Sequence, residues 1–160
     1  MKFTPKHINR FLLFKLPSAW IAGIRLKKIN DEEAVVTAKH RWINQNPFNS
    51  MYFAVLAMGA ELSTGILVMK KIQDTGKPIS MLVTGTQGEF TKKARGRIRF
   101  VCKDGKMIDD QIIQALKTGE GVQFELTSKA YDETDDLVCT FRFRWSIKAK
   151  TVIDVFEGQK

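Results

Sequence analysis

The chain has 160 residues, the usual size of one domain, and 44% of them are hydrophobic while 27% are charged. These fractions are close to those of average globular proteins, so they exclude a largely disordered chain. The net charge of +9 favours anionic partners such as nucleic acids, membrane surfaces or small phosphorylated ligands. No repeat or linker-like tract divides the sequence, and we expect a single domain over residues 1–160.

The cysteines and histidines indicate neither a disulfide scaffold nor a metal site. Cys102 and Cys139 are too few for a disulfide scaffold, and His7 and His40 have no metal-ligand spacing with other residues. Both cysteines fall on the apolar side of alternating segments. We therefore predict that they are buried core residues and that the chain binds no metal.

The N-terminal segment has the pattern of a short amphipathic helix. Its apolar stretch is interrupted by Lys15 and Pro17, whereas a signal peptide needs an uninterrupted apolar core. We predict a helix that ends before Pro17 and has Ile8, Phe11 and Leu12 on one face. Without a signal peptide, a cytoplasmic location is expected.

A strand, a loop and a long apolar segment follow. Residues 33–42 are rich in Val and Thr, which favours a strand, and residues 44–50 (NQNPFNS) have the composition of a loop. Residues 51–69 then run with a single charged side chain, Glu61, and Lys70, Lys71 and Gly76 mark the end of this predicted helix.

The rest of the chain is predicted to be mostly strand. An inserted helix is expected over 107–117, with Ile108, Ile112 and Leu116 at helical spacing. The acidic stretch 132–136 lacks the spacing of a calcium loop and is interpreted as a solvated hairpin turn. The strands are expected over residues 79–90, 97–102, 122–131 and 137–149.

The order and patterning of these elements predict an α+β fold. Strict alternation in residues 137–149 puts Phe143 and Trp145 on a buried face of the strand and Arg142 and Arg144 on a solvent-exposed face. One long antiparallel sheet wrapped around the central helix buries every apolar face in this list.

The segment 51–69 is long enough to span a membrane, but its composition argues against a span. Glu61 lies at its midpoint, where an ionised carboxylate is costly in lipid, and it also contains Gly59, Ser63 and Gly65. A helix that is apolar almost all round is instead typical of a protein core. We therefore predict a buried central helix and no membrane span.

Glu61 is the candidate for chemistry on this helix. Its neighbours at helical spacing are mostly small, which leaves little room for water, and burial raises the pKa of a carboxyl group. These neighbours are Ala54, Ala57, Met58, Thr64, Gly65 and Val68. Such a residue is a candidate general base or nucleophile. Spacing alone leaves open a structural role, in which Glu61 pairs with Lys or Arg or supports a neighbouring subunit.

Residues 46–61 (NPFNSMYFAVLAMGAE) resemble the signature of PaaI-like hot-dog thioesterases. In that signature an Asn precedes a His-Gly-Gly at the start of the central helix, and an acidic residue follows nine positions after the His. Asn46 and Glu61 match the Asn and the acid. Tyr52, Phe53 and Ala54 stand where that family has His-Gly-Gly, so this chain departs from the pattern there. Over residues 5–150 it resembles more closely an uncharacterised branch of the superfamily.

The resemblance implies a hot-dog fold and an acyl-CoA or acyl-carrier thioester hydrolase. Glu61 and Asn46 would be catalytic, and backbone N–H groups near Tyr52 and Phe53 would polarise the thioester carbonyl. No cofactor is implied beyond coenzyme A as part of the substrate, and a homodimer or dimer of dimers is expected. The substrate-binding candidates are Tyr52, Phe53, Ala54, Thr64, Arg95 and Arg97. The alternative is a non-catalytic hot-dog module that binds a fatty-acyl or other apolar ligand.

A basic stripe over residues 92–99 contains Lys92, Lys93, Arg95, Arg97 and Arg99. It is open to three interpretations. It can be a cradle for the phosphates of coenzyme A or phosphopantetheine, a nucleic-acid surface, or a solvated sheet face balanced by acidic side chains. We predict no nucleic-acid partner, because an RNP-type aromatic motif, a Gly-rich clamp and a recognition helix are all missing from the pattern.

Overall fold

The computed structural model describes residues 2–150 of the chain. Its helices are α1 (Pro5–Lys15), α2 (Pro17–Ile21), the 3-10 turn η1 (Trp42–Asn44), α3 (Phe53–Thr75) and α4 (Gly105–Thr118). Its strands are β1 (Arg25–Ile29), β2 (Ala34–Lys39), β3 (Ile79–Phe90), β4 (Arg97–Cys102), β5 (Val122–Tyr131) and β6 (Leu137–Ala149).

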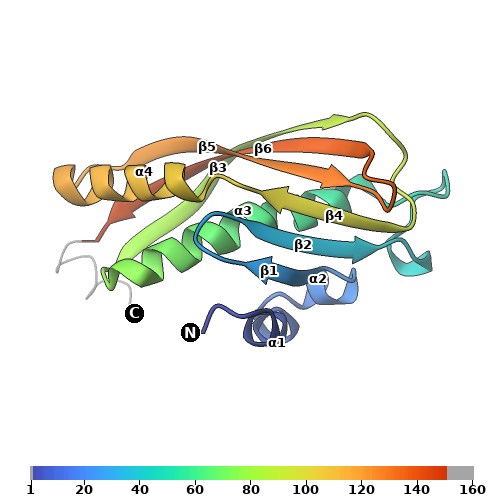
Figure 1. The fold of residues 1–160 in the computed structure, drawn as a ribbon, viewed down its shortest axis with the longest axis horizontal. Coiled ribbons are helices and arrows are strands. Elements are labelled where there is room, and N and C mark those ends of the chain that lie inside the picture. The colour runs from blue at the N-terminus through green and yellow to red at the C-terminus, as the bar shows by residue number, and fades with distance from the viewer. Residues whose placement is uncertain (1, 151–160) are drawn as a thin grey trace.

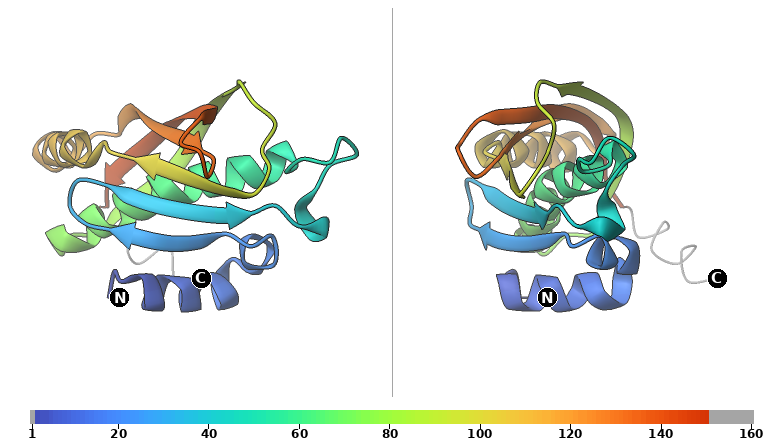
Figure 2. Two further views of the ribbon diagram at one scale, coloured as in Figure 1. Left: turned by 45° about the vertical axis from the view of Figure 1, so that its right-hand side comes forward. Right: turned by 90° about the vertical axis from the view of Figure 1, so that its right-hand side faces the viewer.

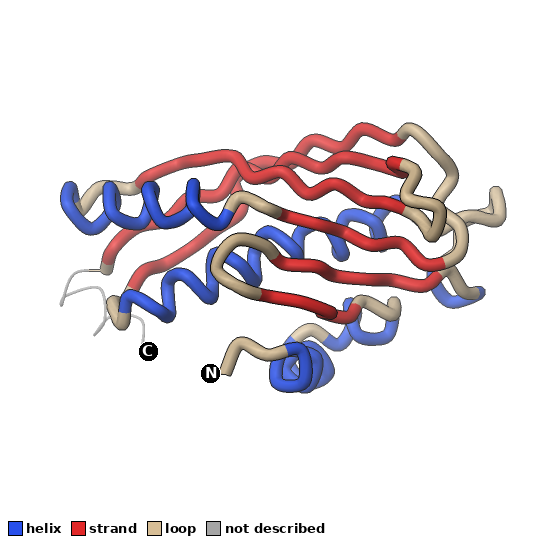
Figure 3. The backbone as a smooth tube through the Cα atoms, viewed as in Figure 1, coloured by secondary structure: helices blue, strands red, loops and turns tan. Residues whose placement is uncertain are grey.

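The strands of this part of the chain form one six-stranded sheet in the order β1-β2-β4-β5-β6-β3. Every neighbouring pair is antiparallel. Figure 1 and Figure 3 show the strands as one layer with α3 lying across it, and the end-on view of Figure 2 shows the layer curling around this helix. The predicted α+β fold, a long antiparallel sheet wrapped around a central helix, is confirmed.

The core lies between α3 and the inner face of the sheet. Alternate residues of β4 (Ile98, Phe100 and Cys102) are fully buried, as the strand pattern predicts. The helix comes close to the sheet at Gly59, where a Cβ atom would lie only 2.4 Å from the ring of Phe100. A glycine is required at this point because the buried Phe100 ring occupies the space of any side chain.

Helix α3 is a core helix. It is the one helix among the described residues that is long and apolar enough to span a membrane, yet most of its apolar length is buried inside the domain. Its buried residues lie on several sides of the helix because the sheet curls around it.

The two edges of the sheet differ in how they are covered. At the β1 edge the side chain of Asn9 in α1 accepts a hydrogen bond from Leu26 N (2.8 Å) and donates one to Leu26 O (2.9 Å). At the other edge β3 pairs with β6 on one side only, and Leu82 and Phe90 on it are exposed. In the described part of the chain, no strand or helix occupies the outer side of β3.

Most predicted elements are confirmed. The first helix ends before Pro17, and the bounds predicted for β3, β4, β5 and β6 match the structure. Both cysteines are buried, and the acidic stretch 132–136 forms the turn between β5 and β6. In the inserted helix Ile108 and Ile112 are buried as predicted.

Four details differ from the sequence-based expectation. The predicted strand over 33–42 ends at Lys39, and Trp42 lies in η1. The side chain of Asn44 ends that strand by donating to the carbonyls of Lys39 (2.9 Å) and Ala22 (2.8 Å). Helix α3 continues to Thr75, and Leu116 is exposed while Ala115 takes its place in the core. The fourth difference is that α2 and β1 were not predicted.

Candidate active site

The start of α3 offers unpaired backbone donors. Tyr52 is the N-cap residue, and its own N–H donates to Asn44 O (2.9 Å). Within the described chain the N–H groups of Phe53 and Ala54 have no acceptor, and no side chain caps the helix. Because the positive end of the helix dipole adds to these two donors, the helix start can hold the oxygen of a polarised carbonyl. The resemblance placed the carbonyl-polarising N–H groups near Tyr52 and Phe53. In the structure the N–H groups that are free for this role are those of Phe53 and Ala54.

Asn46 shapes the loop in front of this helix. Its Oδ1 accepts hydrogen bonds from Phe48 N (2.9 Å), Ser50 N (3.3 Å) and Ser50 Oγ (3.2 Å). These bonds orient the amide, because a backbone N–H needs the oxygen and not the nitrogen as its partner. In the described part of the chain Nδ2 has no acceptor. The Asn46 amide therefore presents a free donor.

Asn46 and Phe53 share a cavity of about 460 Å³, which we call the helix-start pocket. Phe48, Phe53 and Phe90 give it apolar walls, and Lys92 and Lys93 bring positive charge. Lys92 is paired with Asp132 and Asp136 (both 2.6 Å), whereas Lys93 makes no ion pair with a described residue. A site with apolar walls and one free cation suits an apolar ligand that carries an anionic group.

Glu61 lies two turns further along α3 and has no polar partner within residues 2–150. Its side chain extends toward Gly65, and Oε1 lies 3.1 Å from the position of a Cβ atom on that glycine. The same position is 3.0 Å from Cη2 of Trp145, so the carboxylate and the indole ring both lie close to Gly65. Burial raises the pKa of Glu61 above its ordinary value of 4.5. No hydrogen bond or ion pair joins its carboxylate to another described residue.

Thr64 holds this part of the helix against β6. It is fully buried, donates to the carbonyl of Glu61 (2.9 Å) and accepts from Trp145 Nε1 (3.1 Å). The next polar contact along the helix is Ser63 Oγ to Ser128 Oγ (2.7 Å), which also lies inside the core. With both hydrogen bonds made internally, the Thr64 hydroxyl fixes the indole of Trp145 against α3.

One chain does not bring Glu61 and the helix start together. Eight residues separate Phe53 from Glu61, which is about 12 Å along the helix axis. The Glu61 side chain also points further away, toward Gly65. A carbonyl held by the N–H groups of Phe53 and Ala54 is thus out of reach of the carboxylate of the same chain.

The basic stripe is divided between two places. Arg95 precedes β4 and donates from Nε to Asn49 O (3.0 Å), so it lies against the loop that contains Asn46. Arg97 and Arg99 alternate with the buried residues of β4 and therefore lie on the outer face of the sheet, opposite α3. Arg99 is paired with Asp135 (2.6 Å), as the interpretation of a balanced sheet face expects.

Sequence reasoning missed two features of this site. Trp145 was expected on the buried face of its strand, and the structure adds that its ring lies beside Gly65, as the Glu61 carboxylate does. Phe90 was assigned to a strand, and the structure brings its side chain to the helix-start pocket. The strand pattern signals burial in both cases, but the partner depends on how the sheet curls.

The chain matches a family model along most of its length. The model is described as "Domain of unknown function (DUF4442)" and matches residues 4–147. No curated protein matches the chain significantly.

Solved structures with the same fold include several proteins described as thioesterases. One is a Pseudomonas aeruginosa protein of unknown function described as a "probable thioesterase", with 21% identity, a TM-score of 0.79 and coverage of 92% of this chain and 97% of the other. A Chlorobaculum tepidum protein of unknown function has 17% identity, a TM-score of 0.78 and coverage of 92% and 98%. A thioesterase from Haemophilus influenzae has 13% identity, a TM-score of 0.68 and coverage of 93% of each chain. These similarities show that the chain has the hot-dog fold.

Proposed function

This chain belongs to the DUF4442 family of domains of unknown function, and on that premise we propose that it hydrolyses acyl thioesters. The observation that carries the proposal is that α3 has both kinds of group that the reaction needs. Two N–H donors at its start and a half-buried carboxylate further along it have no partner among the described residues. The hot-dog fold, which it shares with proteins described as thioesterases, supports the same reaction class. The PaaI-like assignment rests on the spacing from Asn46 to Glu61 and is part of the proposal.

In the proposed reaction the N–H groups of Phe53 and Ala54 donate to the thioester carbonyl oxygen and stabilise the negative charge that develops on it. The carboxylate of Glu61 takes a proton from a water molecule while the water oxygen attacks the carbonyl carbon. The C–S bond then breaks, and the departing thiolate receives the proton from Glu61. Asn46 orients the water or the carbonyl through its free Nδ2.

The separation of Glu61 from its own helix start supports a site that is built by two chains. We propose a homodimer in which Glu61 of one chain faces the helix start of its partner. The unpaired outer side of β3 and the exposed Leu82 on it support such an assembly, because a long open edge strand is a ready surface for pairing. A dimer of dimers would keep the same composite site.

The substrate is proposed to be an acyl-CoA or an acyl-carrier thioester. The apolar walls of the helix-start pocket suit the acyl part. Lys93 lines this pocket and Arg95 lies against the neighbouring loop, and their proposed role is to bind the phosphates of either thiol carrier. Arg97 lies on the outer face of the sheet. Its proposed contact is therefore limited to a phosphate of the thiol carrier that lies far from the thioester group. A cytoplasmic location stays a prediction.

Turnover of a panel of acyl-CoA and acyl-carrier thioesters tests the proposal. Glu61→Gln keeps the shape of the side chain but cannot take a proton, and we expect its rate to fall by about a hundredfold or more. Glu125→Gln on the exposed outer side of β5 is the matched control and should keep the wild-type rate. Unchanged turnover in Glu61→Gln would remove this carboxylate from the reaction.

A non-catalytic ligand-binding module is the second candidate. The exposed ring of Phe53 favours it, because this ring stands at the helix start, where a thioester carbonyl must approach the backbone closely. This alternative predicts a co-purifying fatty acid or acyl compound in native mass spectrometry and no hydrolysis across the panel.

A further inference from the structure

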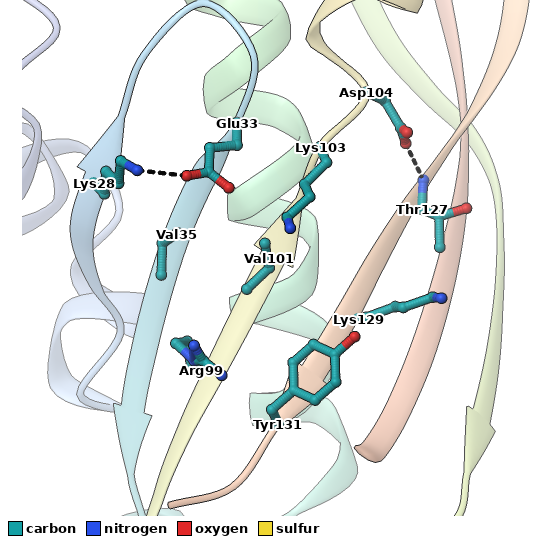
Figure 4. A pocket seen from close by; sticks show the side chains of 10 residues that line it. All are labelled: Lys28, Glu33, Val35, Arg99, Val101, Lys103, Asp104, Thr127, Lys129 and Tyr131. Carbon is teal, nitrogen blue, oxygen red and sulfur yellow. Dashed lines mark hydrogen bonds and ion pairs between the residues drawn. The ribbon is translucent and has the colours of Figure 1, made fainter. Parts of the chain in front are cut away.

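A second cavity opens on the outer face of the sheet, and we propose that it binds a nucleoside phosphate independently of the proposed thioester site. The cavity, here called the outer pocket, has a volume of about 720 Å³, within the range of small-molecule sites. Figure 4 shows its lining residues on β1, β2, β4 and β5 and on the connections next to β2 and β4, with α3 behind the sheet. It is lined by Lys28, Glu33, Val35, Arg99, Val101, Lys103, Asp104, Thr127, Lys129 and Tyr131.

The outer pocket exists because the ladder between β4 and β5 is short. Only three residue pairs join these strands, and the last of them is Val101 with Lys129. Two residues further along β5, Thr127 N donates to the carboxylate of Asp104 (2.8 Å) instead of a carbonyl of β4. The direct ladder between the strands therefore ends where β4 runs toward α4, and Figure 4 shows the Asp104 carboxylate reaching across to Thr127.

The register of the sheet sets apolar and cationic side chains at regular spacing across this face. Lys28, Val35, Val101 and Lys129 are direct cross-strand partners in one row. The two valines form an apolar floor in the middle, and the two lysine Cα atoms are about 14 Å apart, or three strand spacings. In the next row Arg99 is the partner of Tyr131.

The charges of the outer pocket leave two cations available to a ligand. Lys28 is paired with Glu33 (2.6 Å), and Arg99 is paired with Asp135 (2.6 Å). Lys103 and Lys129 form no hydrogen bond or ion pair with any described residue, and both are exposed. The four cations of the lining outnumber its two carboxylates, so the pocket attracts anions.

The carboxylates of the outer pocket are already engaged. The hydrogen bond from Lys28 lowers the pKa of Glu33, and the charge of Lys103 contributes to the same shift. Asp104 accepts from Thr127 N. Each carboxylate therefore has a partner within the protein and needs no metal ion. The groups of the pocket that remain available to a ligand are the ammonium groups of Lys103 and Lys129.

Tyr131 supplies a flat surface at one end of the pocket. The guanidinium carbon of Arg99 lies 5.5 Å from the centre of its ring, within the range of a cation–π contact. A base that stacks on this pair would extend over Val35 and Val101. Its phosphates would then reach Lys103 and Lys129, and this combination of a ring with two anionic contacts identifies a nucleoside phosphate as the ligand class.

Isothermal titration calorimetry on the full chain, with ADP as the probe and inorganic pyrophosphate as the comparison, tests the proposal. We expect saturable binding of ADP that weakens about tenfold or more in the double variant Lys103→Gln/Lys129→Gln, because each lysine makes a charge-assisted contact to phosphate. Tyr131→Leu should weaken the binding of ADP but leave that of pyrophosphate unchanged.

The control variant removes two lysine charges outside the outer pocket. Lys117→Gln/Lys148→Gln changes two exposed lysines outside the pocket and should bind ADP like the wild type. Amide resonances of Val101, Thr127 and Lys129 should shift on titration with ADP. An equal loss of affinity in both double variants, equal affinity for ADP and pyrophosphate, or no saturable binding would each overturn the proposal. A loss caused by Lys93→Gln instead would assign the nucleotide to the helix-start pocket and also overturn it.

Discussion

At the scale of single residues, the carboxylate of Glu61 is the least satisfied group of the site. Burial raises its pKa, and no cation or hydrogen-bond donor among the described residues compensates for the lost hydration. A carboxyl whose pKa is raised by folding holds its proton longer in the folded state than in the unfolded state. The free energy of unfolding therefore falls as the pH rises from the unfolded pKa to the folded pKa, and the loss persists at higher pH.

This reasoning predicts that Glu61→Gln stabilises the folded protein at neutral pH, because a neutral amide replaces a desolvated carboxylate. In thermal unfolding we expect the Tm of Glu61→Gln to exceed the wild-type Tm at about pH 8 and to match it at about pH 4, where both forms are neutral. Glu125→Gln should show no such difference. A lower Tm at about pH 8 would mean that the carboxylate has a partner that stabilises its charge.

The Thr64 hydroxyl is expected to matter for stability as well as for positioning. Thr64→Val removes the acceptor of the buried Trp145 Nε1–H and should lower the free energy of unfolding by about 1–3 kcal/mol. Thr118→Val at the exposed end of α4 is the control and should change it little. Chemical denaturation measures both variants, and equal stabilities would show that the indole finds another acceptor.

The two buried thiols should be inert. Burial raises the pKa of both Cys102 and Cys139 to about 12, so very little thiolate is present at neutral pH. We expect a thiol reagent such as DTNB to react with neither cysteine in the folded protein and with both after denaturation. Rapid labelling of the native chain would contradict the burial of these side chains.

At the scale of elements, the approach of α3 to the sheet depends on one missing side chain. Gly59→Ala would put a methyl group 2.4 Å from the buried Phe100 ring. We expect it to lower the free energy of unfolding by about 1–3 kcal/mol, although alanine favours a helix over glycine. Gly65→Ala, whose Cβ atom has its nearest contact at 3.0 Å, should cost less in the same denaturation experiment. The reverse order would contradict this packing.

The elements that sequence reasoning predicted well are those with clear periodicity. The alternation of β6 continues through most of its 13 residues, and its inward residues Phe141, Phe143 and Trp145 are buried as expected. β1 was missed because it has five residues, two adjacent lysines and a register shift between Leu26 and Lys28, which together hide any alternation. A short irregular strand can be identified from its pairing with a neighbouring strand but not from its own sequence pattern.

The end of α3 confirms one of its three predicted markers. The helix ends before Gly76, which has a left-handed φ of 63°, whereas Lys70 and Lys71 lie inside the helix. Lys71 is buried and paired with Asp109 of α4 (2.6 Å), and Lys70 pairs with Asp74 one turn further on (2.7 Å). The pair between Lys71 and Asp109 joins residues far apart in the sequence, so their spacing could not predict it.

At the scale of the whole molecule, the proposed thioesterase site is complete only if two chains meet. The sequence predicted Asn46 and Glu61 as candidates, and the structure separates the carboxylate from the helix start of the same chain. In the described part of the chain the outer side of β3 is an open edge, which the proposed second chain could pair with. Sequence spacing could not reveal this separation, because it depends on the direction in which the Glu61 side chain points along the helix.

Subunit complementation tests the composite site most directly. Asn46→Ala and Glu61→Gln are each expected to have little thioesterase activity. After the two variants are unfolded together and refolded in equal amounts, half of the dimers contain one chain of each kind. Each mixed dimer then has one intact site, so the mixture should recover about a quarter of the wild-type activity. No recovery, with mixed dimers verified by native mass spectrometry, would contradict the account.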